Sequence, residues 1–217
     1  MTSLALRSDM NYQGHAINSI IFDLGDVIID LDIPGTISRF ADCSGKSVEE
    51  VRMICSTSPV FLDYEKGLIT NTQFRAGANR LFNTSWSDDE LDNIWNSMLL
   101  DVPAEKITML EELARNHRLF LLSNTNDIHI RCFTGIFHKA SGGRPIDDFF
   151  EKVYYSHQIN MRKPNEEIFR FVLEQNRLDP SATLFLDDNA DNIRGAAATG
   201  IHTFHVTHPS VVINVFK

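Results

Sequence analysis

The stretch that most constrains the fold of this chain runs from Ile20 to Asp30 and reads Ile-Ile-Phe-Asp-Leu-Gly-Asp-Val-Ile-Ile-Asp. Apolar residues on either side of Asp23 cover both faces, which is typical of a central strand in a parallel sheet with helices above and below. A carboxylate at the end of such a strand is costly to place unless another group pairs with it. Ligands of open α/β sheets bind beyond the carboxyl ends of the strands. Asp23 is therefore a candidate for chemistry, and a turn-capping role is the alternative.

Length, composition and charge place the chain among soluble globular proteins and argue against several classes of function. Its 217 residues are enough for one substantial core plus a smaller appended unit, and its 43% hydrophobic and 23% charged contents are ordinary. A net charge of -9 argues against a nucleic-acid surface, although a bound divalent cation can still attract an anionic substrate. The three cysteines form no CxxC pair, residues 1–16 carry no secretory signal, and no apolar run reaches the roughly 20 residues that a membrane-spanning helix needs. We therefore expect a cytoplasmic protein without a membrane partner.

Buried-strand patterns alternate with helical patterns along most of the chain. The strands are predicted at residues 18–22, 118–123, 152–156, 183–186 and 201–206. Because strands that alternate with helices are joined by right-handed crossovers, we expect an α/β fold, a Rossmann-like three-layer sandwich around a central parallel sheet. Residues 1–16 are polar without a clear period, and we expect them to form a frayed extension.

The segment from Ile33 to about Leu100 has helix starts and little strand signal. Three capping boxes, which mark helix N-termini, occur at Ser47–Glu50, Thr70–Gln73 and Ser87–Glu90. We therefore expect a helical cap domain at residues 33–100, inserted into an α/β core domain made of residues 1–32 and 101–217. Two connections, near residues 31–35 and 99–103, suit hinge closure of the cap over the edge of the sheet.

Polar residues follow the predicted core strands where ligands bind in such sheets. In chain order they are Asp23, Ser123 with Asn124, Lys163, and Asp187 with Asp188. Carboxylates hold hard divalent cations, and a hydroxyl, backbone N–H groups and an ammonium are donors for phosphate oxygens. Taken singly, each residue has an ordinary explanation as a strand terminator, a surface lysine or a helix cap. Four such coincidences at successive strand ends favour a catalytic site, in which Asp23 attacks a phosphate in line.

These segments resemble the four motifs of the haloacid dehalogenase-like (HAD) hydrolase superfamily. The motifs are Phe22–Ile28, Leu122–Asn124, Arg162–Asn165 and Phe185–Asp188. The predicted helical insert lies where that family places a cap. More narrowly, Leu-Ser-Asn-Thr-Asn, Met-Arg-Lys-Pro and Asp-Asp-Asn-Ala-Asp-Asn at these motifs, with Glu65–Ile69 in the insert, resemble the bacterial α-D-glucose-1-phosphate phosphatase branch.

The resemblance implies a magnesium site at Asp23. In the family pattern Asp23 is both the nucleophile and a ligand of Mg²⁺, and Gly25 contributes its backbone carbonyl to the metal. Asp188 is the direct carboxylate ligand. Asp187 and Asn192 support the site or its water.

The resemblance also implies the substrate and the reaction. Ser123 and Asn124 bind the transferring phosphate, and Lys163 offsets the charge on Asp23 and on that phosphate. The expected activity is magnesium-dependent hydrolysis of a small phosphomonoester through an aspartyl-phosphate. The expected substrate is a sugar phosphate such as glucose 1-phosphate, and electrostatic stabilisation supplies most of the rate in such reactions.

Gly25 departs from the pattern of most family phosphatases, which carry a second Asp two residues after the nucleophile. That Asp protonates the leaving oxygen and then activates water, so its absence removes help worth ~10²–10⁴-fold. The glucose-1-phosphate phosphatase branch resembles this chain in having Gly there. Either Asp26 acts as a substitute, or Asp26 pairs only with loop N–H groups and the substrate needs less help, as a hemiacetal leaving group would.

Two alternative functions follow from the same residues. A 2-haloacid dehalogenase also lacks the second Asp, but it works without metal and without the paired carboxylates of Asp187 and Asp188. A catalytically weak binding or regulatory protein could keep the scaffold, against which the intact Asp23, Lys163 and Asp188 argue.

Several points stay open from the residues alone. Asp63, Tyr64 and Glu65 are candidates for cap residues that select the substrate, and His129, His138 and His157 are candidates for approaching the site. Nothing in the sequence decides between them. The oligomeric state is expected to be a monomer or a small homo-oligomer.

Overall fold

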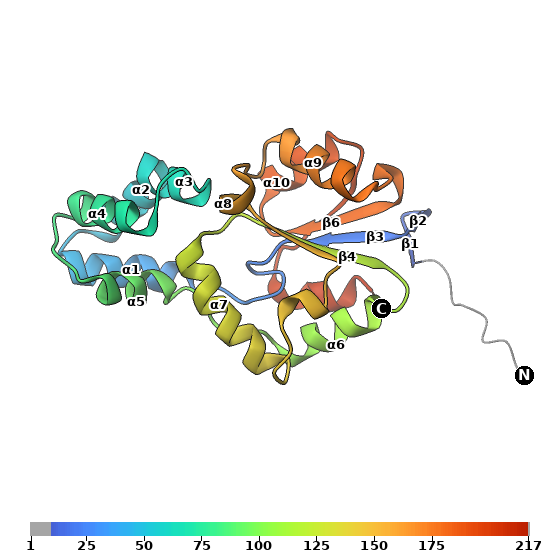
Figure 1. Ribbon diagram of the computed structural model, residues 1–217, viewed down its shortest axis with the longest axis horizontal. Helices are drawn as coiled ribbons and strands as arrows, with labels where there is room; N and C mark the ends of the chain where they lie inside the picture. Colours follow the sequence, from blue (N-terminus) through green and yellow to red (C-terminus); the bar gives the residue numbers. More distant parts are fainter. Residues whose placement is uncertain (1–9, 217) are drawn as a thin grey trace, which may run out of the picture.

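The computed structural model describes residues 10–216, and its centre is one five-stranded parallel sheet (Figure 1). The order across the sheet is β5-β4-β3-β6-β7. The strands are β3 (Ser19–Phe22), β4 (Arg118–Ser123), β5 (Lys152–Tyr155), β6 (Thr183–Asp187) and β7 (His202–His205). The predicted α/β fold with a central parallel sheet is confirmed.

Strand β3 lies in the middle of this sheet because its side chains are apolar on both faces. Ile20, Ile21 and Phe22 are all 0% exposed. Phe22 is in register with Leu121 of β4 on one side and with Leu186 of β6 on the other. The three strands therefore end at the same edge of the sheet, and the residues that follow them lie close together there.

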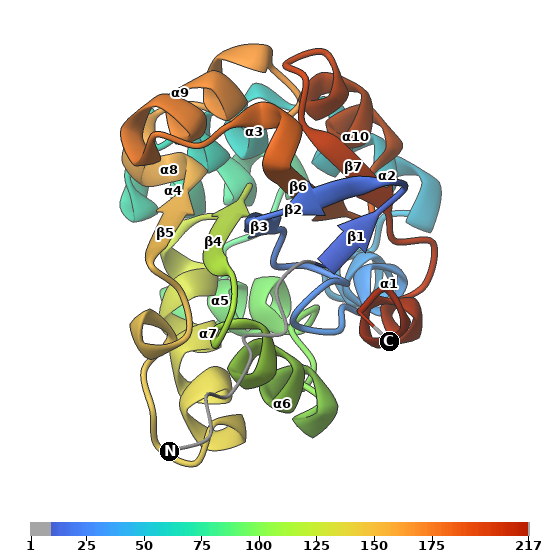
Figure 2. The same ribbon diagram turned by 90° about the vertical axis from the view of Figure 1, so that its right-hand side faces the viewer.

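Helices cover both faces of the sheet (Figure 2). Phe22 packs with α6 and α7 on one face, and Ile21 packs with α9 and α10 on the other. These helices and the short α8 are α6 (Ala104–Leu113), α7 (Asp127–Ala140), α8 (Ser156–Ile159), α9 (Glu166–Asn176) and α10 (Ala190–Ala197). Short 3-10 helices lie at Ile146–Asp148, Pro180–Ala182 and Pro209–Asn214.

Five helices form a group beside the sheet, on the left in Figure 1. They are α1 (Ile33–Ser44), α2 (Val48–Thr57), α3 (Pro59–Glu65), α4 (Asn71–Phe82) and α5 (Asp88–Asn96). All three predicted capping boxes are present, at the starts of α2, α4 and α5. The group buries its own aromatic cluster, which includes Phe40, Phe61, Phe74, Phe82 and Trp95.

The two segments that join this helical group to the rest of the chain run side by side. Leu31 and Leu99 form an antiparallel bridge. The N–H of Asp32 donates to the carbonyl of Met98 at 2.8 Å, and the N–H of Leu100 donates to that of Asp30 at 3.0 Å. Lys106, which is 1% exposed, donates from Nζ to Oδ1 of Asp30 at 2.8 Å. The helical group is thus attached to the sheet through one short two-stranded ribbon.

The expectation of a frayed extension over residues 1–16 is wrong for its second half. Strands β1 (Met10–Tyr12) and β2 (His15–Ile17) form an antiparallel hairpin that leads into β3. The turn between them has Gly14 at φ 89°, which glycine adopts without strain. Residues 1–9 lie outside the described part of the chain. No helix among the described residues has the length and apolar character needed to cross a membrane.

Candidate functional site

Asp23 lies immediately after β3, where the carboxyl ends of the parallel strands meet. Its N–H donates to the carbonyl of Leu186 at 2.9 Å, so the backbone stays in the sheet up to this residue. The residue is only 7% exposed. Its Oδ1 accepts a hydrogen bond from Nζ of Lys163 at 2.6 Å. A buried carboxylate is thus held against a buried ammonium at the position where ligands of such sheets bind.

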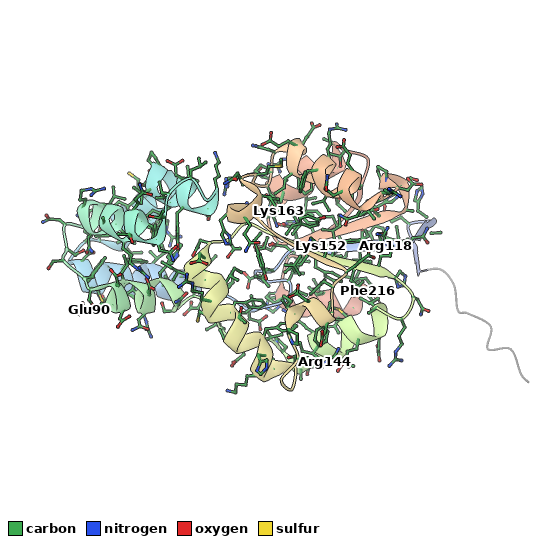
Figure 3. The ribbon with its side chains drawn as sticks, viewed as in Figure 1. Glu90, Arg118, Arg144, Lys152, Lys163 and Phe216 are labelled. Atoms are coloured by element: carbon green, nitrogen blue, oxygen red, sulfur yellow. The ribbon has the colours of Figure 1, made fainter. Side chains whose placement is uncertain are left out.

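Lys163 links two carboxylates that come from neighbouring strands. It is 1% exposed, and its Nζ donates at 2.6 Å both to Asp23 and to Oδ2 of Asp187. Figure 3 places Lys163 at the end of the sheet nearest the α1–α5 helices. Burial alone would lower the pKa of Lys163, but the nearby carboxylates of Asp187 and Asp23 raise it above its ordinary value. The ammonium therefore stays charged between them.

Asn124 fixes the backbone that carries Lys163. Its side-chain amide donates to the carbonyl of Lys163 and accepts from the N–H of Lys163, both at 2.9 Å. The sequence predicts phosphate binding for Asn124, and the structure adds this second contact, which no local pattern reveals. Ser123, at the end of β4, is 3% exposed, and no described residue forms a hydrogen bond with its hydroxyl.

Asp187 and Asp188 have different surroundings although they are adjacent. Asp187 is 0% exposed, and its oxygens accept hydrogen bonds from Lys163, from the N–H of Asn189 at 2.8 Å and from Nδ2 of Asn192 at 3.0 Å. Asp188 is partly exposed, and no other described residue donates a hydrogen bond to its carboxylate. Asp187 is thus saturated by protein donors, and Asp188 keeps its oxygens free.

Three carboxylates gather around one ammonium in this site. Asp23, Asp187 and Asp188 each offer an oxygen within 4.8 Å of the others. Burial, followed by the charge of Asp187, raises the pKa of Asp23 to about 7 against the opposing effect of Lys163. Burial and the charges of Asp187 and Asp26 raise the pKa of Asp188 to about 6. This uncompensated negative charge, with the free oxygens of Asp188, is the donor set that a hard divalent cation requires.

The loop after Asp23 has no room for a side chain at Gly25 in its present packing. A Cβ at Gly25 would lie 2.7 Å from Cδ1 of Leu31, so that side chain would have to move. Asp26 has a left-handed backbone with φ 53°. Its carboxylate accepts the N–H of Leu31 at 3.0 Å, and its own N–H donates to the carbonyl of Ile29 at 2.8 Å. Asp26 thus pairs with a backbone N–H group of its own loop, which is the expected contact if Asp26 is not the acid or base.

We expect the Asp26→Asn variant to keep at least a tenth of the wild-type turnover. Asn tolerates the left-handed backbone, and its amide oxygen can accept the N–H of Leu31 as the carboxylate does. Steady-state kinetics on a phosphomonoester, with melting temperatures as a folding control, measure this. A loss of ~10²-fold or more with an unchanged melting temperature would instead make Asp26 the missing acid.

A cavity of about 290 Å³ lies between the strand ends and the α1–α5 helices. From the strand ends it is lined by Leu24, Gly25 and the segment 123–126. From the helical group it is lined by Ile33, Thr36, Ile37, Cys55, Glu65, Trp95 and Met98. Of the three candidates Asp63, Tyr64 and Glu65, only Glu65 lines it; of His129, His138 and His157, only His129 does. Ser123 and Asn124 therefore share one cavity with side chains of the helical group.

His129 forms part of the wall of this cavity as a neutral ring. Its Nδ1 lies 3.1 Å from Nδ2 of Asn126, whose Oδ1 already accepts the N–H of His129, so Nδ1 acts as the acceptor. Nε2 then carries the proton and donates to the carbonyl of Trp95 at 3.2 Å. The ring stacks on Trp95 with centroids 4.6 Å apart. Burial lowers the pKa of His129 from 6.5 to about 4.

We expect the buried neutral ring of His129 to make the protein less stable as the pH is lowered from 6.5 to 4. In that range the unfolded chain binds a proton at His129 that the folded chain does not, so the free energy of unfolding rises with pH. The contribution lost between pH 7 and pH 4 is about 3 kcal/mol at most. Urea unfolding of wild type and His129→Phe at several pH values isolates this effect. Parallel stability curves for the two proteins would contradict it.

Comparisons with known proteins agree with this geometry. A sequence profile of haloacid dehalogenase-like hydrolases matches residues 105–206. A D-ribitol-5-phosphate phosphatase from Bacteroides thetaiotaomicron is 28% identical over 188 residues, which cover 87% of this chain and 91% of that protein.

Solved structures extend the likeness to nearly the whole chain. A HAD family enzyme from Bacteroides thetaiotaomicron is 37% identical with a TM-score of 0.80, covering 87% of this chain and 93% of that one. It has also been solved with magnesium, and with magnesium and inorganic phosphate. A predicted HAD-like family hydrolase from Porphyromonas gingivalis is 33% identical with a TM-score of 0.78, covering 87% and 90% of the two chains. The chain therefore belongs to the haloacid dehalogenase-like hydrolase family.

Proposed function

We propose that this protein is a magnesium-dependent phosphatase that hydrolyses a small phosphomonoester through an aspartyl-phosphate on Asp23. The observation that carries the proposal is the buried contact of Asp23 with Lys163 beside the free carboxylate of Asp188, at the edge where the parallel strands end. The phosphatase activity of the relative from Bacteroides thetaiotaomicron, and the magnesium and phosphate bound by the solved HAD family enzyme, support it.

The residues divide the work of the first half-reaction. An oxygen of Asp23 attacks phosphorus, and the leaving oxygen departs in line with it. Lys163 favours the ionised form of Asp23 against the effect of burial and offsets negative charge on the phosphate, and Asp187 with Asn192 holds Lys163 in place. The hydroxyl of Ser123 is free to donate to a phosphate oxygen.

Magnesium fits the oxygen donors of this site. Asp23 and Asp188 would hold the ion, with the backbone carbonyl of Gly25 as the third protein ligand that we propose. A bound magnesium ion neutralises charge on the phosphate oxygens and orients them. Asp187 is excluded as a direct ligand in this arrangement because protein donors already occupy both of its oxygens.

We further propose that residues 33–100 act as a cap over the core formed by residues 1–32 and 101–217. The helical group has its own aromatic cluster and a two-stranded attachment, which suits rigid-body movement about the ribbon at Leu31 and Leu99. Closure would exclude water from the cavity and strengthen charge interactions around the phosphate.

The substrate that we propose is a sugar phosphate, with glucose 1-phosphate as the first candidate. Gly25 cannot protonate a leaving oxygen, and a hemiacetal oxygen needs less protonation than a simple alcohol. The sequence resemblance to the glucose-1-phosphate phosphatase branch supports this choice. The relative that acts on D-ribitol 5-phosphate makes an open-chain sugar alcohol phosphate the second compound to test.

A substrate panel with and without magnesium tests the proposal. Glucose 1-phosphate, glucose 6-phosphate, D-ribitol 5-phosphate and nucleoside monophosphates are compared by phosphate release, with EDTA as the metal-free control. We expect release from a sugar phosphate that EDTA abolishes. A clear preference for nucleotides would reject the sugar substrate, and activity unaffected by EDTA would reject the metal.

Two other functions fit the site less well. A metal-independent dehalogenase has no use for three carboxylates within 4.8 Å of one another, and chloride release from 2-haloacids in EDTA would be needed to support it. For a catalytically weak binding protein, wild type and Asp23→Asn would show equal and negligible rates with p-nitrophenyl phosphate.

A cytoplasmic location is also a proposal. It is supported by Cys43, Cys55 and Cys132, which are all free thiols.

A further inference from the structure

A positioned base accelerates the hydrolysis of an aspartyl-phosphate, and the loop next to Asp23 does not supply one. Water that attacks phosphorus must lose a proton, and a positioned base accelerates this step by ~10²–10⁴-fold. Gly25 has no side chain, and Leu31 fills the space where one would begin. Asp26 holds the N–H of Leu31. The base must therefore come from elsewhere on the wall of the cavity; this inference rests on the proposed phosphatase function.

Among residues 10–216, three titratable side chains line that cavity, and two of them are unsuited to accept a proton. They are Cys55, Glu65 and His129. Burial raises the pKa of Cys55 to about 12, so its thiol stays neutral. Both ring nitrogens of His129 are engaged, with Asn126 and with the carbonyl of Trp95, and protonation at Nδ1 would set two donors against each other. Glu65 remains.

Glu65 is held in the cavity wall by contacts from the core. It is the last residue of α3, and its carbonyl accepts a hydrogen bond from the hydroxyl of Ser156 at 2.6 Å. Its Oε2 accepts from Nη2 of Arg162 at 2.9 Å, and Arg162 directly precedes Lys163. Its Oε1 has no hydrogen-bond partner among the described residues. The carboxylate is therefore positioned from the loop that also carries Lys163, with one oxygen free.

The turn after Glu65 fits closely against the core, which fixes its backbone. Gly67 has φ 67°, and a Cβ there would lie 2.0 Å from the carbonyl oxygen of His157. Asn160 donates from Nδ2 to the carbonyl of Lys66 at 2.8 Å. A movement that separates the helical group from the core would break these contacts together. Glu65 thus lines the cavity only while the helical group is closed on the core.

We propose that Glu65 is the general base of the second half-reaction. The oxygen of a water molecule bonds to phosphorus, and the bond between phosphorus and Asp23 breaks with its electron pair returning to the Asp23 carboxylate. The proton of the water passes to Oε1 of Glu65 and from there to the departing phosphate or to solvent. The base is carried by the helical group, so water is activated only after closure.

The test compares Glu65→Gln with Asp63→Asn. Both changes remove one carboxylate from α3, but Asp63 does not line the cavity. p-Nitrophenyl phosphate is mixed rapidly with each protein in magnesium buffer, and nitrophenol release and phosphoenzyme mass are followed. We expect Glu65→Gln to give a burst of one nitrophenol per site, then a steady rate ~10²-fold or more below wild type, with the phosphoenzyme accumulating. Asp63→Asn should behave as wild type.

Other outcomes separate the failure of this proposal from failure of the phosphatase function. The role as base is overturned if Glu65→Gln keeps the steady turnover of wild type. It is also overturned if the variant is slower only through a raised KM and accumulates no phosphoenzyme. Equal losses in the two variants also overturn it, because they would report a general effect of charge on α3. A wild type that forms no phosphoenzyme at all rejects the proposed function itself.

Discussion

The Asp23→Asn variant should lose turnover by about 10⁴-fold or more, since an amide cannot form the acyl phosphate. The substitution keeps the shape of the side chain, and Lys163 retains its second partner, Asp187, at 2.6 Å. Burial and the charge of Asp187 disfavour the ionised Asp23 carboxyl. Replacing it by a neutral amide should therefore leave the melting temperature equal to that of wild type or higher.

Three measurements check this expectation on the same protein samples. Phosphate release gives the turnover, intact mass after mixing with substrate shows whether a phosphoenzyme forms, and thermal unfolding shows whether the fold is kept. Asp26→Asn makes the same chemical change three residues away and is the matched control. A variant at Asp23 that keeps more than about a hundredth of the activity would contradict a nucleophilic role, because other groups could then carry the reaction.

The residues at the strand ends were predictable because the apolar pattern that specifies each strand is local in the sequence. Ile20, Ile21 and Phe22 are apolar on both faces, which specifies a central strand, and its two neighbours have equally apolar runs. Once Phe22 aligns with Leu121 and Leu186, the next residues of three strands share one edge. The capping boxes of the helical group are local in the same sense, since each lies within four residues.

The cavity wall was not predictable in this way, because it is assembled from elements that are distant in sequence. The contact of Glu65 with Ser156 joins residues 91 positions apart, and that with Arg162 joins residues 97 apart. No period or motif encodes how α3 docks on α8. Asn124 is a related case, since its contacts with the backbone of Lys163 require the loop after α8 to return to β4.

The N-terminal hairpin could not be predicted from the sequence for a different reason. Its two strands have only 3 residues each, and in isolation such a hairpin is marginally stable. Tertiary contacts hold it in place: the hydroxyl of Tyr12 donates to the carbonyl of Thr203 in β7 at 3.1 Å, and the N–H of Asn18, just after the hairpin, donates to that of Ala182 at 2.9 Å. A reading that relies on hydrophobic period alone has no access to these contacts.

Lys163→Met should be the most destabilising single substitution at the site, and it should also abolish turnover. The change leaves Asp23 and Asp187 buried without a cation, and breaking a buried ion pair in this way costs about 3–5 kcal/mol. Lys152→Met is the matched control, because Lys152 is exposed on β5 and its loss should change the free energy of unfolding by no more than about 0.5 kcal/mol.

Magnesium distinguishes the electrostatic cause from a simple loss of packing. If uncompensated carboxylates destabilise Lys163→Met, a divalent cation bound at Asp23 and Asp188 should restore part of the free energy of unfolding, and restore more than it adds to wild type. Adding Asp187→Asn to Lys163→Met should also recover stability, because it removes one of the stranded charges. Urea unfolding with and without magnesium measures both effects. Equal responses of wild type and variant to magnesium, together with no recovery in the double variant, would mean that Lys163 stabilises the fold by filling space.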